Sequence, residues 1–227
     1  FLINQFFVFN DPPTTAIYTL SLHDALPIFA VTFLGQQNRL VSAGSDRHLH
    51  VWDPSSKAPG EAFRKVQPSG TIRVRFAHQG PWYVAAGANG ELWRQDAATG
   101  KTNWTVRSDR GRMGGLALTA DDAFVVTGGQ AGRIAVRSST NGALIREFTF
   151  GKSPIRALAG QPDGRLVAAG GDDRVVWLLD VESGTVCRQF PRMTARIGRT
   201  AFSPDGEYVL SCGPDERLVV WPVRATN

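Results

Sequence analysis

The chain has 227 residues, of which 42% are hydrophobic and 24 are glycine, and this composition excludes an intrinsically disordered protein. No apolar run is long enough to cross a bilayer, so we expect no membrane span. The formal net charge is +5 at pH 7, but the arginines are scattered along the chain, which argues against nucleic acid as the partner.

The first 28 residues differ from the rest of the chain. They contain no Lys, Arg or Glu, and nothing in them matches the pattern that follows. They lack the basic start and the small-residue cleavage site of a signal peptide. Residues 10–28 resemble the translation of a common sequencing-adapter oligonucleotide. We therefore expect residues 1–28 to be a contaminating segment and not a domain, and the genuine chain to be truncated at its N-terminus.

A short phrase repeats every 42 or 43 residues after this segment. Its glycines are Gly44, Gly87, Gly129, Gly171 and Gly213. The residues two positions later are Asp46, Asn89, Ala131, Asp173 and Asp215, and the first and last copies also share Trp52 and Trp221. Repeats of this length indicate one small structural unit stacked several times. We therefore expect five repeats, at about 29–70, 71–112, 113–154, 155–196 and 197–227.

Each repeat contains four strand signals, which we call strands a, b, c and d in chain order. Strand a alternates apolar and polar residues, as at Val74 and Phe76. Strand b ends in small residues, and strand c is an apolar run. A turn containing Gly100, Gly142 or Gly184 precedes strand d in the second to fourth repeats. Four antiparallel strands in each unit predict an all-β fold, a β-propeller with one four-stranded blade per repeat.

Three features resemble the WD-repeat family: the Gly-x-Asp spacing, the Phe-Ser-Pro-Asp-Gly turn at 202–206, and the Val51-Trp52-Asp53 end of strand c. The resemblance covers residues 29–227 and implies a ring of seven blades, of which five are present. In the family the last outer strand usually comes from the N-terminal part of the ring. This fits a fifth repeat that stops just past strand c.

The same resemblance implies a protein-interaction scaffold with no catalysis of its own, which can form the C-terminal part of a larger protein. One family feature is absent, namely the His that hydrogen-bonds the Asp of the tight turn. We therefore expect Asp46, Asp173 and Asp215 to accept hydrogen bonds from their own turn backbone, as Asx turns do.

The family resemblance also implies where a protein partner binds. Partners usually meet the face formed by the turns between strands d and a and between strands b and c. The residues at those positions here are Ser45, Ala88, Gln130, Asp172, Pro214, Arg73 and Arg199. Arg73 and Arg199 are the strongest candidates, because arginine is enriched in binding hot spots and both occupy the same repeat position.

We find no phosphate-binding loop, no nucleophile motif and no Cys/His cluster, so we expect no enzyme activity, no metal and no cofactor. Cys187 and Cys212 are interpreted as inert thiols, and His48 and His50 as ordinary strand residues. The segment 96–104 resembles the tryptophan-docking motif of quinoprotein propellers, so an enzyme propeller is one alternative function. A nucleic-acid-binding platform is the other. No motif indicates a compartment, and the cytoplasm is the working expectation.

The two ends of the array should each lack one neighbouring blade. An unpartnered blade exposes the apolar face that its neighbour would cover. We expect this exposure around Val31, Phe33, Leu40 and Leu49 in the first repeat, and around Phe202, Val209, Leu218 and Val220 in the fifth. Residues 219–223 should also form an open strand edge.

Overall fold

The computed structural model describes residues 28–33, 40–44, 48–52, 61–66, 71–97, 99–108, 111–162 and 164–224. The secondary-structure elements in these ranges are all β-strands, numbered β1 to β19. The segment 1–28, which we expect to be foreign to the fold, lies outside the described residues except for Ile28.

The strands form five sheets that follow one another along the chain. The first sheet contains β1 (Ile28–Phe33), β2 (Leu40–Gly44), β3 (His48–Trp52) and β4 (Glu61–Val66). The second contains β5 (Thr71–Phe76), β6 (Trp82–Gly87), β7 (Glu91–Asp96) and β8 (Thr102–Arg107). The third contains β9 (Gly115–Leu118), β10 (Phe124–Gly128), β11 (Arg133–Ser138) and β12 (Leu144–Thr149). The fourth contains β13 (Ile155–Gly160), β14 (Leu166–Gly171), β15 (Val176–Asp180) and β16 (Thr185–Gln189). The fifth contains β17 (Arg199–Phe202), β18 (Tyr208–Cys212) and β19 (Leu218–Pro222).

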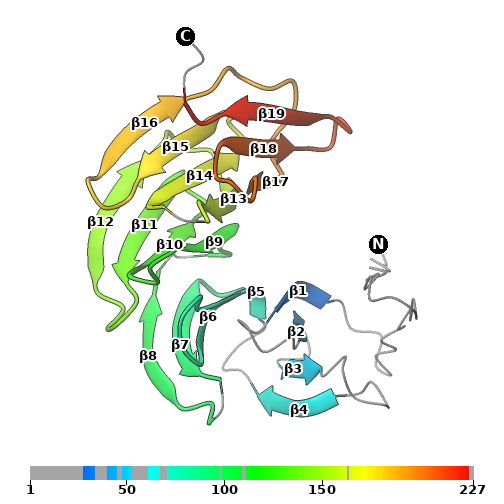
Figure 1. The fold of residues 1–227 in the computed structure, drawn as a ribbon, viewed down its shortest axis with the longest axis vertical. Coiled ribbons are helices and arrows are strands. Elements are labelled where there is room, and N and C mark those ends of the chain that lie inside the picture. The colour runs from blue at the N-terminus through cyan, green and yellow to red at the C-terminus, as the bar shows by residue number, and fades with distance from the viewer. Residues whose placement is uncertain are drawn as a thin grey trace.

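Every sheet is an antiparallel meander, and the sheets are arranged in an arc. The first strand of each sheet lies on the inner side of the arc and the last strand on the outer side (Figure 1). The inner strands are neighbours in chain order, β1 beside β5, β5 beside β9, β9 beside β13 and β13 beside β17. This arrangement confirms the predicted all-β fold of propeller-type blades, whereas a ring of seven blades remains a prediction.

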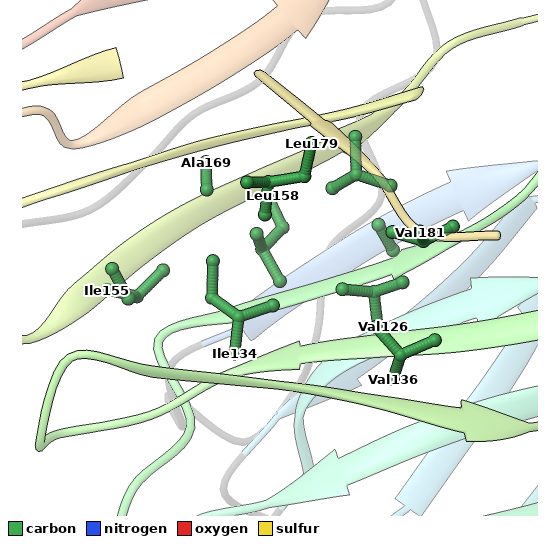
Figure 2. Close-up of a cluster of buried hydrophobic side chains, with 10 residues drawn as sticks. Val126, Ile134, Val136, Ile155, Leu158, Ala169, Leu179 and Val181 are labelled. Carbon is green, nitrogen blue, oxygen red and sulfur yellow. The ribbon is translucent and has the colours of Figure 1, made fainter. Parts of the chain in front are cut away.

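The hydrophobic core lies between sheets and not within any one of them. Four clusters of buried side chains fill the four boundaries between successive sheets. At the boundary of the third and fourth sheets, Ile134 and Val136 of β11 face Ile155 and Leu158 of β13 (Figure 2). Each of these four side chains is at most 4% exposed. A sheet with two apolar faces therefore depends on both of its neighbours for burial.

In the fourth and fifth repeats the repeated glycine is required by a close backbone approach. A Cβ on Gly171 would lie 2.0 Å from the carbonyl oxygen of Pro154, just before β13. A Cβ on Gly213 would lie 2.2 Å from the carbonyl oxygen of Arg196, just before β17. Real Cβ atoms essentially never come within 3.0 Å of such an atom. Glycine thus allows strand b to approach the segment that leads into strand a.

The exposed ends of the array only partly match the expectation. Val31 is 36% exposed in the first sheet, and Leu218 and Val220 are 64% and 52% exposed in the fifth. The expectation was wrong for Leu40, Leu49 and Val209, which are buried. Leu49 packs against the second sheet and Val209 against the fourth, because alternate residues of a strand point to opposite faces. The side chain of Phe33 lies outside the described residues.

Candidate functional site

The two arginines predicted to contact a partner occupy equivalent places on two inner strands. Arg73 on β5 lies opposite Ala86 of β6, and Arg199 on β17 lies opposite Cys212 of β18. Figure 1 shows β5 and β17 on the inner side of the arc, in its second and fifth sheets. The two residues, far apart in the sequence, therefore lie on strands that both line the inner side of the arc.

Two further arginines join them. Burial, followed by the charges of Arg199, Arg75 and Arg112, lowers the pKa of Arg73 from its ordinary value to about 10. Burial and the charge of Arg199 also lower the pKa of Arg75. Arg75 follows Arg73 by two residues on β5 and so points to the same side of the strand. We call Arg73, Arg75, Arg112 and Arg199 the inner arginine cluster.

Two members of this cluster, Arg75 and Arg199, hydrogen-bond main-chain carbonyls beside them. Arg75 Nη1 donates to the carbonyl oxygen of Val74 at 2.9 Å, and Arg199 Nη1 donates to that of Gly198 at 3.0 Å. Among the residues that the structure describes, no carboxylate forms an ion pair with Arg75 or Arg199.

Three arginines elsewhere in the described chain have acidic partners. Arg133 lies 3.7 Å from Glu147, and Arg156 pairs with Asp172. Arg165 lies 2.9 Å from Asp180 and 2.7 Å from Glu182. These three pairs differ from Arg75 and Arg199, whose described hydrogen bonds go to main-chain carbonyls.

The remaining residues predicted for the binding face are placed as follows. Gln130 is exposed in the turn after β10, and its Nε2 donates to the carbonyl oxygen of Arg112 at 3.3 Å. Gln130 thus contacts the segment that carries one member of the cluster. Ala88 and Pro214 are exposed in the corresponding turns, while Ser45 lies outside the described residues.

Asp172 lies in the corresponding turn after β14, where its carboxylate is held by a neighbour. Arg156 donates to both carboxylate oxygens, with Nη2 at 2.7 Å from Oδ2. Hydrogen bonding from Arg156, together with the charges of Arg156 and Arg196, lowers the pKa of Asp172. Arg156 reaches it from a β-bulge at the start of β13. A partner that contacts Asp172 would have to share it with this arginine.

Two of the turn aspartates that define the repeat accept hydrogen bonds from side chains, and Asp173 also accepts one from its own turn backbone. Asp173 Oδ1 accepts from the backbone N–H of Val175 at 3.2 Å, which is an Asx turn, and Asp173 Oδ2 accepts from Trp177 Nε1 at 2.8 Å. Asp215 Oδ2 accepts from the hydroxyl of Thr194. Asp46 lies outside the described residues. Every repeat glycine lies at the end of strand b or directly after it. Gly44, Gly87 and Gly171 are the last residues of β2, β6 and β14, and Gly129 and Gly213 directly follow β10 and β18.

Trp52 and Trp221 occupy equivalent places in the first and fifth sheets. Trp52 Nε1 donates to Ser42 Oγ at 2.9 Å, and Trp221 Nε1 donates to Ser211 Oγ at 2.8 Å. Each serine lies on strand b and each tryptophan ends or nearly ends strand c of the same sheet. These tryptophans therefore link two strands of one blade, and no ligand is needed to explain them.

The tryptophan of segment 96–104 has a structural role between two blades. Trp104 Nε1 on β8 donates to the carbonyl oxygen of Ser139 in the third sheet at 2.8 Å. A Cβ on Gly142 would lie 3.0 Å from the indole ring, so glycine leaves room for it. The packing of Trp104 between sheets accounts for this motif without a cofactor.

The positions equivalent to Trp104 on the next two outer strands also reach toward the following sheet. A Cβ on Gly184 would lie 1.7 Å from Arg146 Nη1, which places the Arg146 guanidinium directly over that turn. Arg188 Nη1 donates to the carbonyl oxygen of Pro222 at 2.7 Å. Three successive boundaries are thus bridged from the same repeat position by one tryptophan and two arginines.

Other chemistry is sparse in the described part of the chain. No group of three or more His, Cys, Asp or Glu side chains within it could hold a metal ion. Cys187 on β16 and Cys212 on β18 are free thiols. No helix among the described residues is long and apolar enough to cross a membrane.

Comparison with known protein families gives one match. The sequence matches WD40, described as WD domain, G-beta repeat, over residues 14–53, 142–180 and 185–222, which together exceed half of the chain. The first matched segment begins inside residues 1–28, so the boundary near residue 28 remains a prediction. None of the curated proteins compared with the chain matches it significantly.

Proposed function

Because the chain belongs to the WD40 repeat family, we propose that it is a non-catalytic protein-interaction scaffold whose partner binds over the inner arginine cluster. WD40 repeats of propeller type suggest such a scaffold in general terms. The specific proposal concerns the surface that is used. It rests on Arg73 and Arg199, which come from the same repeat position and lie close enough for the charge of Arg199 to lower the pKa of Arg73.

The scaffold proposal has a physical basis in how the fold is held together. The sheets are locked by four apolar boundaries, so the inner strands form a rigid support for the side chains at their ends. Arginine on a rigid support loses little further freedom on binding, and it forms charge-assisted hydrogen bonds. A partner with acidic groups gains both advantages at this surface.

The test is affinity capture with the full chain as bait, comparing the wild type with the double variant Arg73→Ala/Arg199→Ala. We expect the double variant to lose a partner that the wild type retains. The matched control is Arg133→Ala/Arg165→Ala, which removes the same charge from two arginines that pair with acids elsewhere. Thermal melting of all three proteins checks that each is folded. Equal retention by the wild type and both variants would contradict the proposed surface.

The two alternative functions have separate tests. A quinoprotein-like enzyme would require a cofactor site, and the motif that suggested it is accounted for by the contact of Trp104 with Ser139. A nucleic-acid platform would show affinity for oligonucleotides that falls steeply with rising salt. Retention of a protein partner at physiological salt, with no such affinity, would favour the scaffold.

A further inference from the structure

The connection between β16 and β17, residues 190–198, runs from the outer strand of the fourth sheet to the inner strand of the fifth (Figure 1). Three of its side chains are at most 6% exposed and belong to the apolar boundary between these two sheets, namely Phe190, Met193 and Ile197. Arg192 and Arg196 lie between these buried side chains in the sequence and are exposed. The connection therefore presents two arginines at the surface from a buried base.

Backbone hydrogen bonds fix this connection along the turn between β14 and β15. The N–H group that follows Arg192 in the chain donates to the carbonyl oxygen of Arg174 at 2.8 Å, and the N–H group that follows Arg196 donates to that of Gly171 at 2.9 Å. Gly171 ends β14, and Arg174 lies two residues before β15. Arg192 and Arg196 are thereby held beside a turn that carries a third arginine. We call Arg174, Arg192 and Arg196 the turn arginines.

The turn arginines form no ion pair within the described part of the chain. The two acids of the same turn already have partners. Asp172 binds Arg156 through both carboxylate oxygens, and Asp173 accepts from Trp177 Nε1 and from its own turn backbone. A guanidinium carries five N–H donors in a fork that matches a carboxylate. The turn arginines therefore offer donors to carboxylates from outside the chain.

Arg174 has a backbone conformation that favours glycine. Its φ is 66°, whereas Gly90 and Gly132 occupy the same repeat position of the second and third sheets with φ of 83° and 69°. A side chain in this left-handed region costs free energy that glycine avoids. Asp122, which has a φ of 59°, is explained by its buried carboxylate, which accepts backbone N–H groups from the second sheet. The guanidinium of Arg174 has no such ion pair or hydrogen bond in the described chain, which supports a role outside it.

Glu216 occupies the same repeat position in the fifth sheet, with a φ of 60°, and it adds a negative charge near the turn arginines. The hydroxyl of Thr194, midway along the connection, donates to Asp215, the residue before Glu216. Nucleic acid is bound along a groove or stripe of positive charge that follows many phosphates. Here Asp172 and Glu216 interrupt such a stripe, so separate carboxylates on a short protein segment fit the surface better.

We propose that the turn arginines bind an acidic segment of a protein partner. Arg192 and Arg196 hold carboxylates along the connection, and Arg174 holds one at the end of the turn. The buried base keeps these side chains in place, which lowers the entropy lost on binding. Because this surface is made by residues other than Arg73 and Arg199, it goes beyond the proposed function and does not depend on it.

The test uses the full chain and two fluorescent peptide libraries. One library carries Asp or Glu at alternate positions, the other carries Asn or Gln there, and the remaining positions are randomised. Fluorescence anisotropy at physiological salt measures binding. We expect the acidic library to bind at least about tenfold more tightly, because hydrogen bonds to charged groups are the stronger ones. The double variant Arg192→Gln/Arg196→Gln should lower that affinity about tenfold or more. Arg165→Gln, which removes the charge of an exposed arginine in the turn between β13 and β14, should leave it unchanged.

Arg174→Gly separates a binding role from a structural one. Glycine relieves the left-handed backbone, so the variant should melt at the same temperature as the wild type or higher. Its affinity for the acidic library should nevertheless fall about tenfold. A lower melting temperature with unchanged affinity would mean that Arg174 serves the fold, and this would overturn its assignment to the surface.

Equal binding of the two libraries would overturn the proposal, as would an equal loss of affinity in Arg165→Gln and in the double variant. Tighter binding of a single-stranded oligonucleotide, with a steep salt dependence, would assign the turn arginines to nucleic acid instead. If affinity capture still shows a partner that requires Arg73 and Arg199 while the libraries bind equally, the scaffold function stands and only the acidic contact fails.

Discussion

The third and fifth sheets have the same repeat pattern but very different burial. Ile134 and Val136 on β11 are each 0% exposed, whereas Leu218 and Val220, at the same positions of β19, are 64% and 52% exposed. The third sheet has a described sheet on both sides, whereas the fifth has one only on the side of the fourth. The comparison shows that the apolar pattern is enough to form the strand, while the neighbouring sheet decides whether its side chains are buried.

The largest expected difference comes from truncating the same position in both sheets. Ile134→Ala should lower the free energy of unfolding by about 3 kcal/mol, because it leaves a cavity between the third and fourth sheets. Leu218→Ala should change it by less than about 0.5 kcal/mol, because the side chain is largely exposed. Urea denaturation measures both. Similar losses for the two variants would mean that another chain segment covers Leu218.

A second test adds an atom instead of removing several. A Cβ on Gly128 would lie 2.5 Å from Ile155 Cγ2 across the packed boundary with the fourth sheet. Gly128→Ala should therefore destabilise the chain by about 2 kcal/mol, as overpacking does. The equivalent residue of the fifth sheet is Cys212, which is only partly buried, and Cys212→Ala should have little effect. Chemical denaturation that finds Gly128→Ala neutral would show that the boundary can open.

A third test concerns the positive charge of Arg199, which the fifth sheet contributes beside Arg75 of the second sheet. Burial and Arg199 lower the pKa of Arg75, so the charged form is less stable in the folded chain than in the unfolded one. Removing that charge at neutral pH should therefore stabilise the fold, and Arg75→Met should raise the free energy of unfolding by about 1 kcal/mol. Thermal and urea denaturation measure it. If Arg75→Met is destabilising, the positive charge is balanced within the chain.

The smallest effect is expected in the turns that follow strand b. The ion pair of Asp172 with Arg156 belongs to the fourth sheet only, since Pro214 replaces the acid in the fifth. The pair is partly exposed, so Asp172→Asn should cost about 0.5 kcal/mol at neutral pH. The folded pKa of Asp172 lies below the ordinary 3.8, so this stabilisation is complete above about pH 4 and is lost as the pH falls through the folded value. Unfolding curves from pH 2 to 7 should show the variant and wild type converging in acid.

Spacing and turn residues predict the architecture well, because both act locally. The repeated glycines mark the end of strand b in every sheet, and the close approach at Gly171 and Gly213 explains why glycine is required there. The exposure of Leu49 and Val209 could not be predicted with the same success. The exposure depends on which of the two adjacent sheets each face of a strand packs against. The alternation of apolar and polar residues along the strand does not reveal this.

The candidate site could be predicted only in part. Arg73 and Arg199 can be found from their shared repeat position, and the alternation along β5 could have added Arg75 as a residue on the same side. Arg112 has no such signal, since it lies in the segment that leads into β9. The pairing of Asp172 with Arg156 also could not be foreseen, because it depends on a bulge at the start of β13.

The side chains that bridge the outer strands have a consequence for how the chain avoids misassembly. Repeats of nearly equal length and pattern can pair with the wrong neighbour while they fold, or exchange between molecules. Here three of the four boundaries are bridged at the outer strands, with Trp104 over Gly142, Arg146 over Gly184, and Arg188 bound to the Pro222 carbonyl. A blade docked one place too early would bring a guanidinium to a turn shaped for an indole, or the reverse. The outer strands thus distinguish the boundary of the second and third sheets from the two that follow it.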